Sequence, residues 1–77
     1  MSNVKEKKKY RDLVYKNLAK RLKELMSEHD ISDINELAIE VGIDRNTAKR
    51  LLNGDEVTLK TLCYVAHGFG ISIKELF

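Results

Sequence analysis

The stretch that decides the fold is LAIEVGIDRNTAKRLLNG, residues 37–54. Its apolar residues recur at helical spacing on both sides of a Gly-Ile-Asp turn, which predicts two short helices with almost nothing between them. In the second helix, at about 100° per residue, polar and apolar side chains occupy separate arcs. The polar arc holds Arg45, Asn46, Lys49, Arg50 and Asn53, and the apolar arc holds Ala48, Leu51 and Leu52.

Capping signals set the bounds of the first of these helices. Asp33 followed by Glu36 predicts a capping box for a helix from about Ile34 to Val41. Gly42 is expected to end it in the left-handed conformation. The residues predicted to be buried are Ile34, Leu37, Ala38 and Val41, with Ile43 closing the turn against the core.

The second helix is bounded by the same kinds of capping residue. Asp44 is expected to cap a helix from about Arg45 to Asn53, and Gly54 is expected to end it. Two helices with only three residues between them must cross steeply, which is the geometry of a helix-turn-helix unit.

A longer helix is expected before this unit. It runs from about Tyr10 to a point between Ser27 and His29. Its predicted core face holds Val14, Leu18, Leu22, Leu25 and Met26, and a lysine stripe on another face holds Lys9, Lys16, Lys20 and Lys23.

A fourth helix, about residues 59–69, is expected after Thr58 as its cap, with Gly70 at its end. Ser72 and Glu75 predict a further capping box and a last short turn through Phe77. The inward residues of the fourth helix are predicted to be Leu59, Leu62, Cys63, Ala66 and Phe69. With no strand candidate, the chain is expected to be all-α, a compact bundle of four to five helices.

The positive charge is concentrated at the N-terminus. Residues 1–24 hold nine Lys and Arg against three Asp and Glu, a net charge of +6, while residues 25–77 sum to −4. Residues 1–9 are therefore interpreted as a basic N-terminal arm or a helix extension, and residues 10–77 as the folded domain. Such an asymmetry suits contact with a polyanion.

Composition argues against several other classes. The 43% apolar fraction is typical of a globular domain, and neither a membrane-spanning stretch nor a signal peptide is recognisable, so we expect a cytoplasmic protein. The single Cys63 excludes an internal disulfide. His29 and His67 lack partners at metal-ligand spacing, and no nucleophile motif or phosphate loop is present. We expect no enzyme activity, metal, cofactor or small-molecule substrate.

These residues resemble the Cro/repressor-type helix-turn-helix family, the Xre-like regulators of phages and bacteria. The resemblance covers about residues 13–77 and rests on an ordered set of features rather than on any one of them. They are Leu37-Ala38, the turn Gly42-Ile43, Gly54, the run Phe69-Gly70-Ile71-Ser72 and the closing Leu76-Phe77. The resemblance implies a lambda-repressor-like domain that binds double-stranded DNA through its third helix, commonly as a homodimer on a two-fold symmetric operator.

The resemblance also implies roles for single residues. The first, second and sixth residues of the third helix commonly meet base edges in the family, which here are Arg45, Asn46 and Arg50; Lys49 lies between them. Arg can bind guanine and Asn can bind adenine through two hydrogen bonds each. The residues expected at the DNA backbone are Thr47, Asn53, Lys9, Lys16 and Lys20.

The chain departs from the family at positions that touch or support DNA. Ile34 stands where a Gln often opens the second helix, and Leu52 where a Glu often pairs with an Arg of the first. Asp55 and Glu56 are acidic where many members are basic. Two functions therefore stay open: a sequence-specific regulator, most simply a repressor, or a protein-interaction module on the same fold (an antirepressor, accessory subunit or antitoxin) with weak or no specific DNA binding. The contact of a homodimer is left open between Ile71, Ile73 and Phe77 on one side and Leu13 and Tyr15 on the other.

Overall fold

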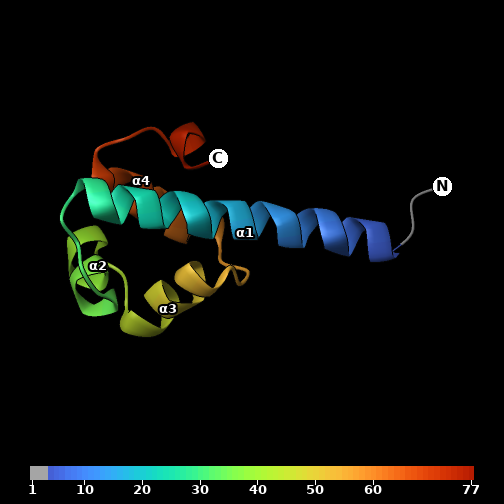
Figure 1. Ribbon diagram of the computed structural model, residues 1–77, viewed down its shortest axis with the longest axis horizontal. Helices are drawn as coiled ribbons and strands as arrows, with labels where there is room; N and C mark the ends of the chain where they lie inside the picture. Colours follow the sequence, from blue (N-terminus) through green and yellow to red (C-terminus); the bar gives the residue numbers. More distant parts are fainter. Residues whose placement is uncertain (1–3) are drawn as a thin grey trace.

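Residues 4–77 form four α-helices and a terminal 3-10 turn (Figure 1). The computed structural model describes the backbone of residues 4–77 and the side chains of residues 6–77, so residues 1–3 of the predicted arm lie outside the described residues. No strand occurs within residues 4–77, and the predicted all-α class is confirmed. The elements are α1 (Val4–Glu28), α2 (Ile34–Val41), α3 (Arg45–Asn53), α4 (Leu59–Phe69) and η1 (Ile73–Leu76).

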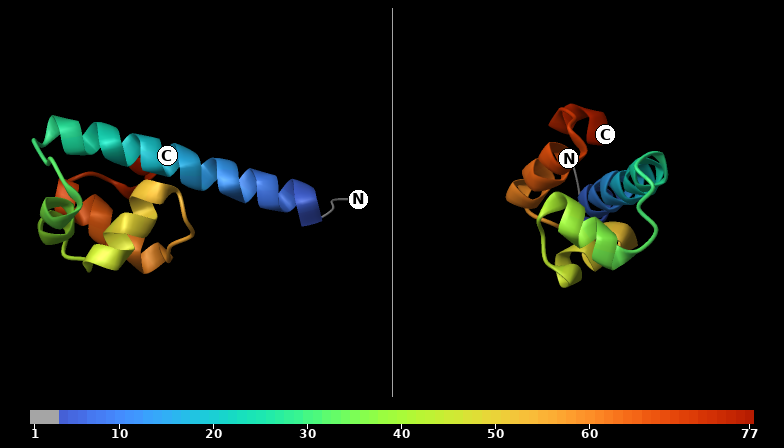
Figure 2. Two further views of the ribbon diagram at one scale, coloured as in Figure 1. Left: turned by 60° about the horizontal axis from the view of Figure 1, so that its bottom comes forward. Right: turned by 90° about the vertical axis from the view of Figure 1, so that its left-hand side faces the viewer.

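Helix α1 is longer than the sequence pattern predicted, because it begins at Val4 rather than near Tyr10. No proline or glycine interrupts this segment, so a helix started by the packed half continues at little cost. The C-terminal half lies against the other helices, whereas the N-terminal half projects beyond them (Figures 1 and 2). Every side chain from Glu6 to Leu13 is exposed. The molecule measures 44 × 23 × 21 Å, with the projection along its long dimension.

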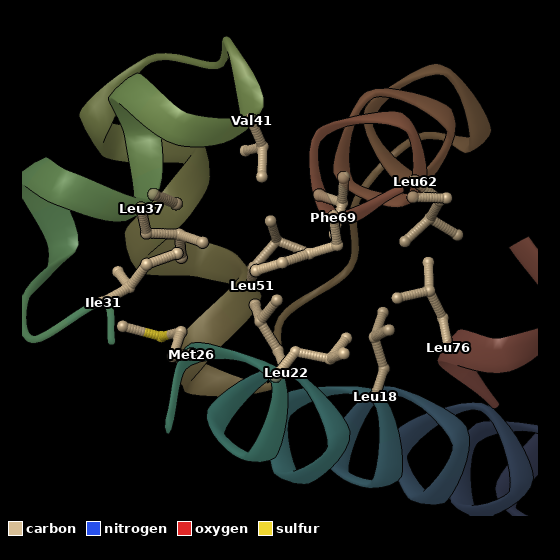
Figure 3. Packing of buried hydrophobic residues seen from close by; sticks show 14 of the residues in the cluster. Leu18, Leu22, Met26, Ile31, Leu37, Val41, Leu51, Leu62, Phe69 and Leu76 are labelled. Carbon is tan, nitrogen blue, oxygen red and sulfur yellow. The ribbon is translucent and has the colours of Figure 1, made fainter. Parts of the chain in front are cut away.

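The core forms where the packed half of α1 meets α2, α3, α4 and η1 (Figure 3). Leu22 of α1, Leu37 of α2 and Leu76 of η1 are fully buried, and Phe69 of α4 is 5% exposed. The predicted core face of α1 is confirmed for four of its five members. Leu18, Leu22, Leu25 and Met26 are buried, and Val14 at the edge of the core is half-buried.

Helix α2 has the predicted bounds, but only half of the predicted capping box. The carboxylate of Asp33 accepts a hydrogen bond from the backbone N–H of Glu36 (2.9 Å). The Glu36 carboxylate does not return to the N–H of Asp33; it accepts from the backbone N–H (2.9 Å) and the hydroxyl (3.1 Å) of Ser32. Gly42 ends the helix with φ +74°, and its N–H donates to the carbonyl of Ala38.

Helix α3 follows after the predicted turn and is held by its apolar arc. Ala48 and Leu51 are buried, and Leu52 is half-buried against the same core. Asp44 occupies the N-cap position without a side-chain bond to the helix backbone, so the predicted cap is present in backbone geometry only. Ile43 is half-buried against the core, as expected from its place in the turn.

Helix α4 has the predicted bounds and cap, but its inward face was misassigned. The hydroxyl of Thr58 accepts from the N–H of Thr61 (3.2 Å). Leu59 is 68% exposed and Cys63 is also exposed, so the prediction that they face inward is wrong. Val65, which was not among the predicted inward residues, is fully buried. The arc centred on Leu62, Val65, Ala66 and Phe69 faces the core, and Leu59 and Cys63 fall outside it.

Two further contacts fix the C-terminal elements. A Cβ at Gly68 of α4 would lie 2.7 Å from the Cα of Val41, so only glycine permits this approach of α4 to α2. The capping box of Ser72 and Glu75 is present, as predicted, and leads into η1, whose Leu76 closes the core beside α1.

Candidate nucleic-acid interface

The polar arc of α3 points away from the core. Because Ala48 and Leu51 fix the opposite side of this helix, Arg45, Asn46 and Lys49 are all exposed. Within the described part of the chain, the side chains of these three residues make no hydrogen bond or ion pair. Their donors are therefore available to an external partner, as the sequence pattern predicted for a recognition surface.

Arg50 belongs to the same arc, but its side chain already donates a hydrogen bond within the chain. Its Nη2 donates to the backbone carbonyl of Glu56 at 2.7 Å, in the loop that connects α3 to α4. The guanidinium thus lies at the C-terminal end of α3, beyond the turn at Gly54. Asn53, near the same end, is exposed.

Thr47, expected at the DNA backbone, lies at the boundary of the arc and is half-buried. Its hydroxyl donates to the carboxylate of Asp44, and this hydrogen bond lowers the pKa of Asp44 from its ordinary value. Asp44 is consequently an anion at neutral pH, placed at the N-terminus of α3 where the helix dipole favours negative charge.

A polar groove runs between α3 and the N-terminal end of α4. It consists of two adjoining hollows of about 350 and 270 Å³, with Thr47 and Thr61 lining both. The larger is completed by Arg50, Glu56, Val57 and Thr58, and the smaller by Gly42, Ile43, Asp44, Lys60 and Tyr64. The exposed arc of α3 therefore borders a groove whose walls carry hydroxyls, the cations of Arg50 and Lys60, and the carboxylates of Asp44 and Glu56.

The lysine stripe of α1 is exposed along its length, and its lysines differ in how close they lie to α3. Lys9 belongs to the run from Glu6 to Leu13 in which every side chain is exposed, whereas Lys16 and Lys20 fall in the part of α1 that holds the buried Leu18 and Leu22. The backbone of Lys16 touches the end of α3, since a Cβ at Gly54 would be 3.5 Å from the Cα of Lys16. The fold therefore brings Lys16 beside the C-terminal end of α3.

The acidic loop after α3 is attached to α1. The carboxylate of Glu56 lies 3.9 Å from Nη1 of Arg11, and the hydroxyl of Tyr15 donates to the carbonyl of Val57 (3.4 Å). The sequence pattern does not mark Arg11 as a site residue, and it indicates Tyr15 only as a candidate dimer contact. A separation of 42 residues between Tyr15 and Val57 leaves no local pattern from which this contact is recognisable.

The two dimer contacts left open by the sequence differ in exposure. Tyr15, Ile71 and Ile73 are half-buried and pack against the core, so none of these three is a fully free apolar side chain. The large exposed apolar residues are Tyr10, Leu13, Ile39, Leu59, Tyr64 and Phe77. Of the residues in the two proposed dimer contacts, Leu13 and Phe77 are the ones whose side chains are exposed and can contact a second copy of the chain.

Two other features, a cluster of metal ligands and a membrane-spanning helix, are absent from the described residues. Residues 6–77 contain no group of three or more His, Cys, Asp or Glu side chains arranged to hold a metal ion. None of the helices in the described chain is long and apolar enough to cross a membrane.

Comparison with protein-family models matches residues 21–77 to the Cro/C1-type HTH DNA-binding domain. The matched segment holds the C-terminal end of α1 and all of α2, α3, α4 and η1, which is the packed body of the molecule except for the buried Leu18 and Ala19 of α1. The projecting half of α1 lies outside it. Comparison with curated proteins gives no match, and neither does comparison with solved structures.

Proposed function

The chain belongs to the Cro/C1-type helix-turn-helix DNA-binding domain family, and on that premise we propose that it is a sequence-specific transcriptional regulator. In this proposal α3 enters the major groove of double-stranded DNA. The observation that carries it is the outward arc of α3, where Arg45, Asn46 and Lys49 are exposed and unpaired while the opposite face is anchored in the core.

The chemistry of this arc suits base recognition. A guanidinium at position 45 can donate two parallel hydrogen bonds to O6 and N7 of guanine, and the amide of Asn46 can donate to and accept from adenine. Lys49, one turn further on, reaches a base edge or a phosphate. Arg50 completes the arc, although its guanidinium must leave the carbonyl of Glu56 to reach a base.

Backbone contacts hold the register of α3. We assign them to Thr47 and Asn53 beside the reading face and to Lys9, Lys16 and Lys20 on α1, all of which carry donors suited to phosphate oxygens. The hydroxyl of Thr47 must leave the carboxylate of Asp44 to donate to a phosphate. Lysines on a helix give charge without base preference, so they add affinity wherever the DNA backbone passes. The fully exposed stripe and the net charge of +6 in residues 1–24 support this assignment.

Repression is the simplest regulatory outcome, because occupying an operator is enough to block a promoter. We propose a homodimer acting in the cytoplasm on a two-fold symmetric site, with half-sites about 34 Å apart so that two α3 helices read one face of the duplex. The exposed Leu13 or Phe77 provides an apolar side chain for the contact between copies.

A second candidate function is a protein-interaction module that uses the fold without specific DNA binding, as in an antirepressor, an accessory subunit or an antitoxin. The observation in its favour is Ile39, which is 81% exposed on the outer side of α2. Asp55 and Glu56 support it too, because acidic residues beside α3 repel phosphate.

Selection of bound sites from random-sequence DNA, repeated at two salt concentrations, separates these functions. The proposal predicts enrichment of a two-fold symmetric motif at both. Weak binding that lacks a motif and disappears at the higher salt concentration would limit DNA contact to the lysine stripe. No binding at either salt would favour the protein-interaction module.

A further inference from the structure

We infer that Arg50 is a positioning residue, which holds the loop between α3 and α4 against the recognition helix, and that the base preference is carried by Arg45, Asn46 and Lys49. This inference rests on the proposed function and divides its recognition arc into two parts. The carrying observation is the hydrogen bond from Arg50 Nη2 to the carbonyl of Glu56.

The loop has few other restraints. Asp55, Glu56 and Val57 lie between two helices without regular structure, and the N–H of Asp55 donates to the carbonyl of Arg50 (2.9 Å). The half-buried side chain of Val57 packs against the core, and its carbonyl accepts from Tyr15 at the long distance of 3.4 Å. A bond of 2.7 Å from a charged donor is the shortest of these contacts, and charge-assisted hydrogen bonds are about twice as strong as neutral ones.

The ion pair between Arg11 and Glu56 does not replace this bond. Its atoms are 3.9 Å apart, and the side chains are 51% and 63% exposed. Exposed pairs of this kind contribute little to stability because solvent screens them. The bond from Arg50 to the carbonyl of Glu56 is exposed as well, but it is shorter by more than 1 Å. Arg50 is therefore the principal polar tie of the loop, and α1 provides a weaker second attachment through Arg11 and Tyr15.

The direction of the Arg50 side chain fits this role. It reaches a carbonyl six residues along the chain, beyond the end of α3, and so draws the guanidinium away from the exposed N-terminal part of the helix. Arg45, Asn46 and Lys49 make no comparable contact within the described chain. Reading a base with Arg50 costs an existing bond, whereas reading with the other three does not.

The loop that Arg50 holds determines one wall of the groove beside α3. Arg50, Glu56, Val57 and Thr58 line the larger hollow together with Thr47. Thr58 is also the N-cap of α4, so movement of the loop displaces the start of that helix. Releasing the loop is therefore expected to alter how closely any DNA approaches the reading face, independently of the base pair presented.

The test compares Arg50→Ala, Arg50→Lys and Arg45→Ala on the selected site and on every single-base variant of it. For Arg50→Ala we expect affinity to fall by about tenfold on all sequences alike, the scale of one hydrogen bond to a charged group, with an unchanged base preference. Arg50→Lys should recover most of the affinity, because an ammonium can donate to a carbonyl but cannot replace a bidentate base contact. Lys74→Ala, a change of the same charge on η1, is the matched control.

A second measurement uses the free protein. Backbone order parameters of residues 55–57 should be near the rigid value of about 0.85 in the wild type and fall in Arg50→Ala, while those of α2 stay constant. The inference is overturned by unchanged loop order, or by an Arg50→Ala variant that loses preference at one base pair. If the wild-type chain binds no DNA, the proposed function and the assignment of base readers fail together. The order parameters of residues 55–57 then still decide whether Arg50 holds the loop against α3.

Discussion

The molecule presents two basic helical surfaces, α3 and the projecting half of α1. They differ in packing, in composition and in their place relative to the family match. Helix α3 is nine residues long, lies within the family match and is fixed to the core by Ala48 and Leu51. The projecting half of α1 lies outside the match, and its described side chains, from Glu6 to Leu13, are all exposed. Its charge comes mainly from lysine, whereas α3 combines arginine, asparagine and lysine.

The difference separates recognition from attraction. Telling one base from another needs donors and acceptors held in a fixed direction, which packing supplies to α3 but not to the projection. Attraction to phosphate needs only charge near the backbone, and a lysine on a solvated helix provides it. We therefore expect changes in α3 or its anchor to alter which DNA is bound, and changes in the α1 stripe to alter how tightly any DNA is bound.

The largest effect is expected from removing the anchor of α3. Leu51→Ala leaves a cavity in the core and should lower the free energy of unfolding by about 2–5 kcal/mol. Thermal or urea unfolding measures the loss. The matched control is Tyr10→Ala on the projecting half, where the side chain is 74% exposed and the expected change is within about 0.5 kcal/mol. Equal losses of stability in the two variants would show that α3 and the projecting half of α1 are packed equally well.

Next in size is the loss of a base-reading side chain. Arg45→Ala should cost about 1–3 kcal/mol of binding free energy on the selected site, and the loss should be confined to the base pair that Arg45 contacts. Binding to single-base variants of the site, at one fixed salt concentration, measures this. A uniform loss across all sequences would instead place Arg45 on the phosphate backbone.

Smaller changes are expected from the lysine stripe. Replacing Lys9, Lys16 or Lys20 with Gln should each reduce the slope of log K against log salt by about 1, without changing base preference. Lys16 and Lys9 form the most informative pair, because Lys16 lies beside the end of α3 whereas Lys9 belongs to the run of exposed side chains from Glu6 to Leu13. Titrations at several salt concentrations measure the slope, and an unchanged slope in all three variants would remove α1 from the interface.

The smallest effect concerns Asp44 at the start of α3. The hydrogen bond from Thr47 lowers its pKa in the folded chain below the unperturbed value of 3.8. Its contribution to stability is therefore present above about pH 4 and is lost as the pH falls through the lowered pKa. The stability difference between the wild type and Asp44→Asn should shrink on acidification below pH 4. A difference that grows in acid would mean that the pKa is raised instead.

Features determined by neighbouring residues were predictable from sequence. Helices α2, α3 and α4 have the expected bounds because Asp33, Thr58, Gly42, Gly54 and Gly70 act within one turn of the helix ends that they define. The exposed arc of α3 followed from spacing alone, since its two faces are unambiguous.

Features determined by distant parts of the chain were not predictable in this way. Cys63 and Val65 of α4 are both small apolar residues, and only the position of α2 and α1 decides which of them is buried. The tie between Arg50 and Glu56 is equally hidden, because the acceptor is a backbone carbonyl that carries no sequence signal. The lysine stripe was predictable from the sequence. Which of its lysines lie on the packed half of α1 and which on the projecting half depends on where the core ends.

The central claim, that α3 reads the DNA, is most directly tested by following backbone amide resonances of the chain while the selected DNA is added. We expect the largest shifts on residues 45–50 and weaker shifts along the lysine stripe of α1, whereas non-specific DNA should shift the resonances of the stripe only. Shifts concentrated on η1 and the outer side of α4, with residues 45–50 unmoved, would contradict the claim.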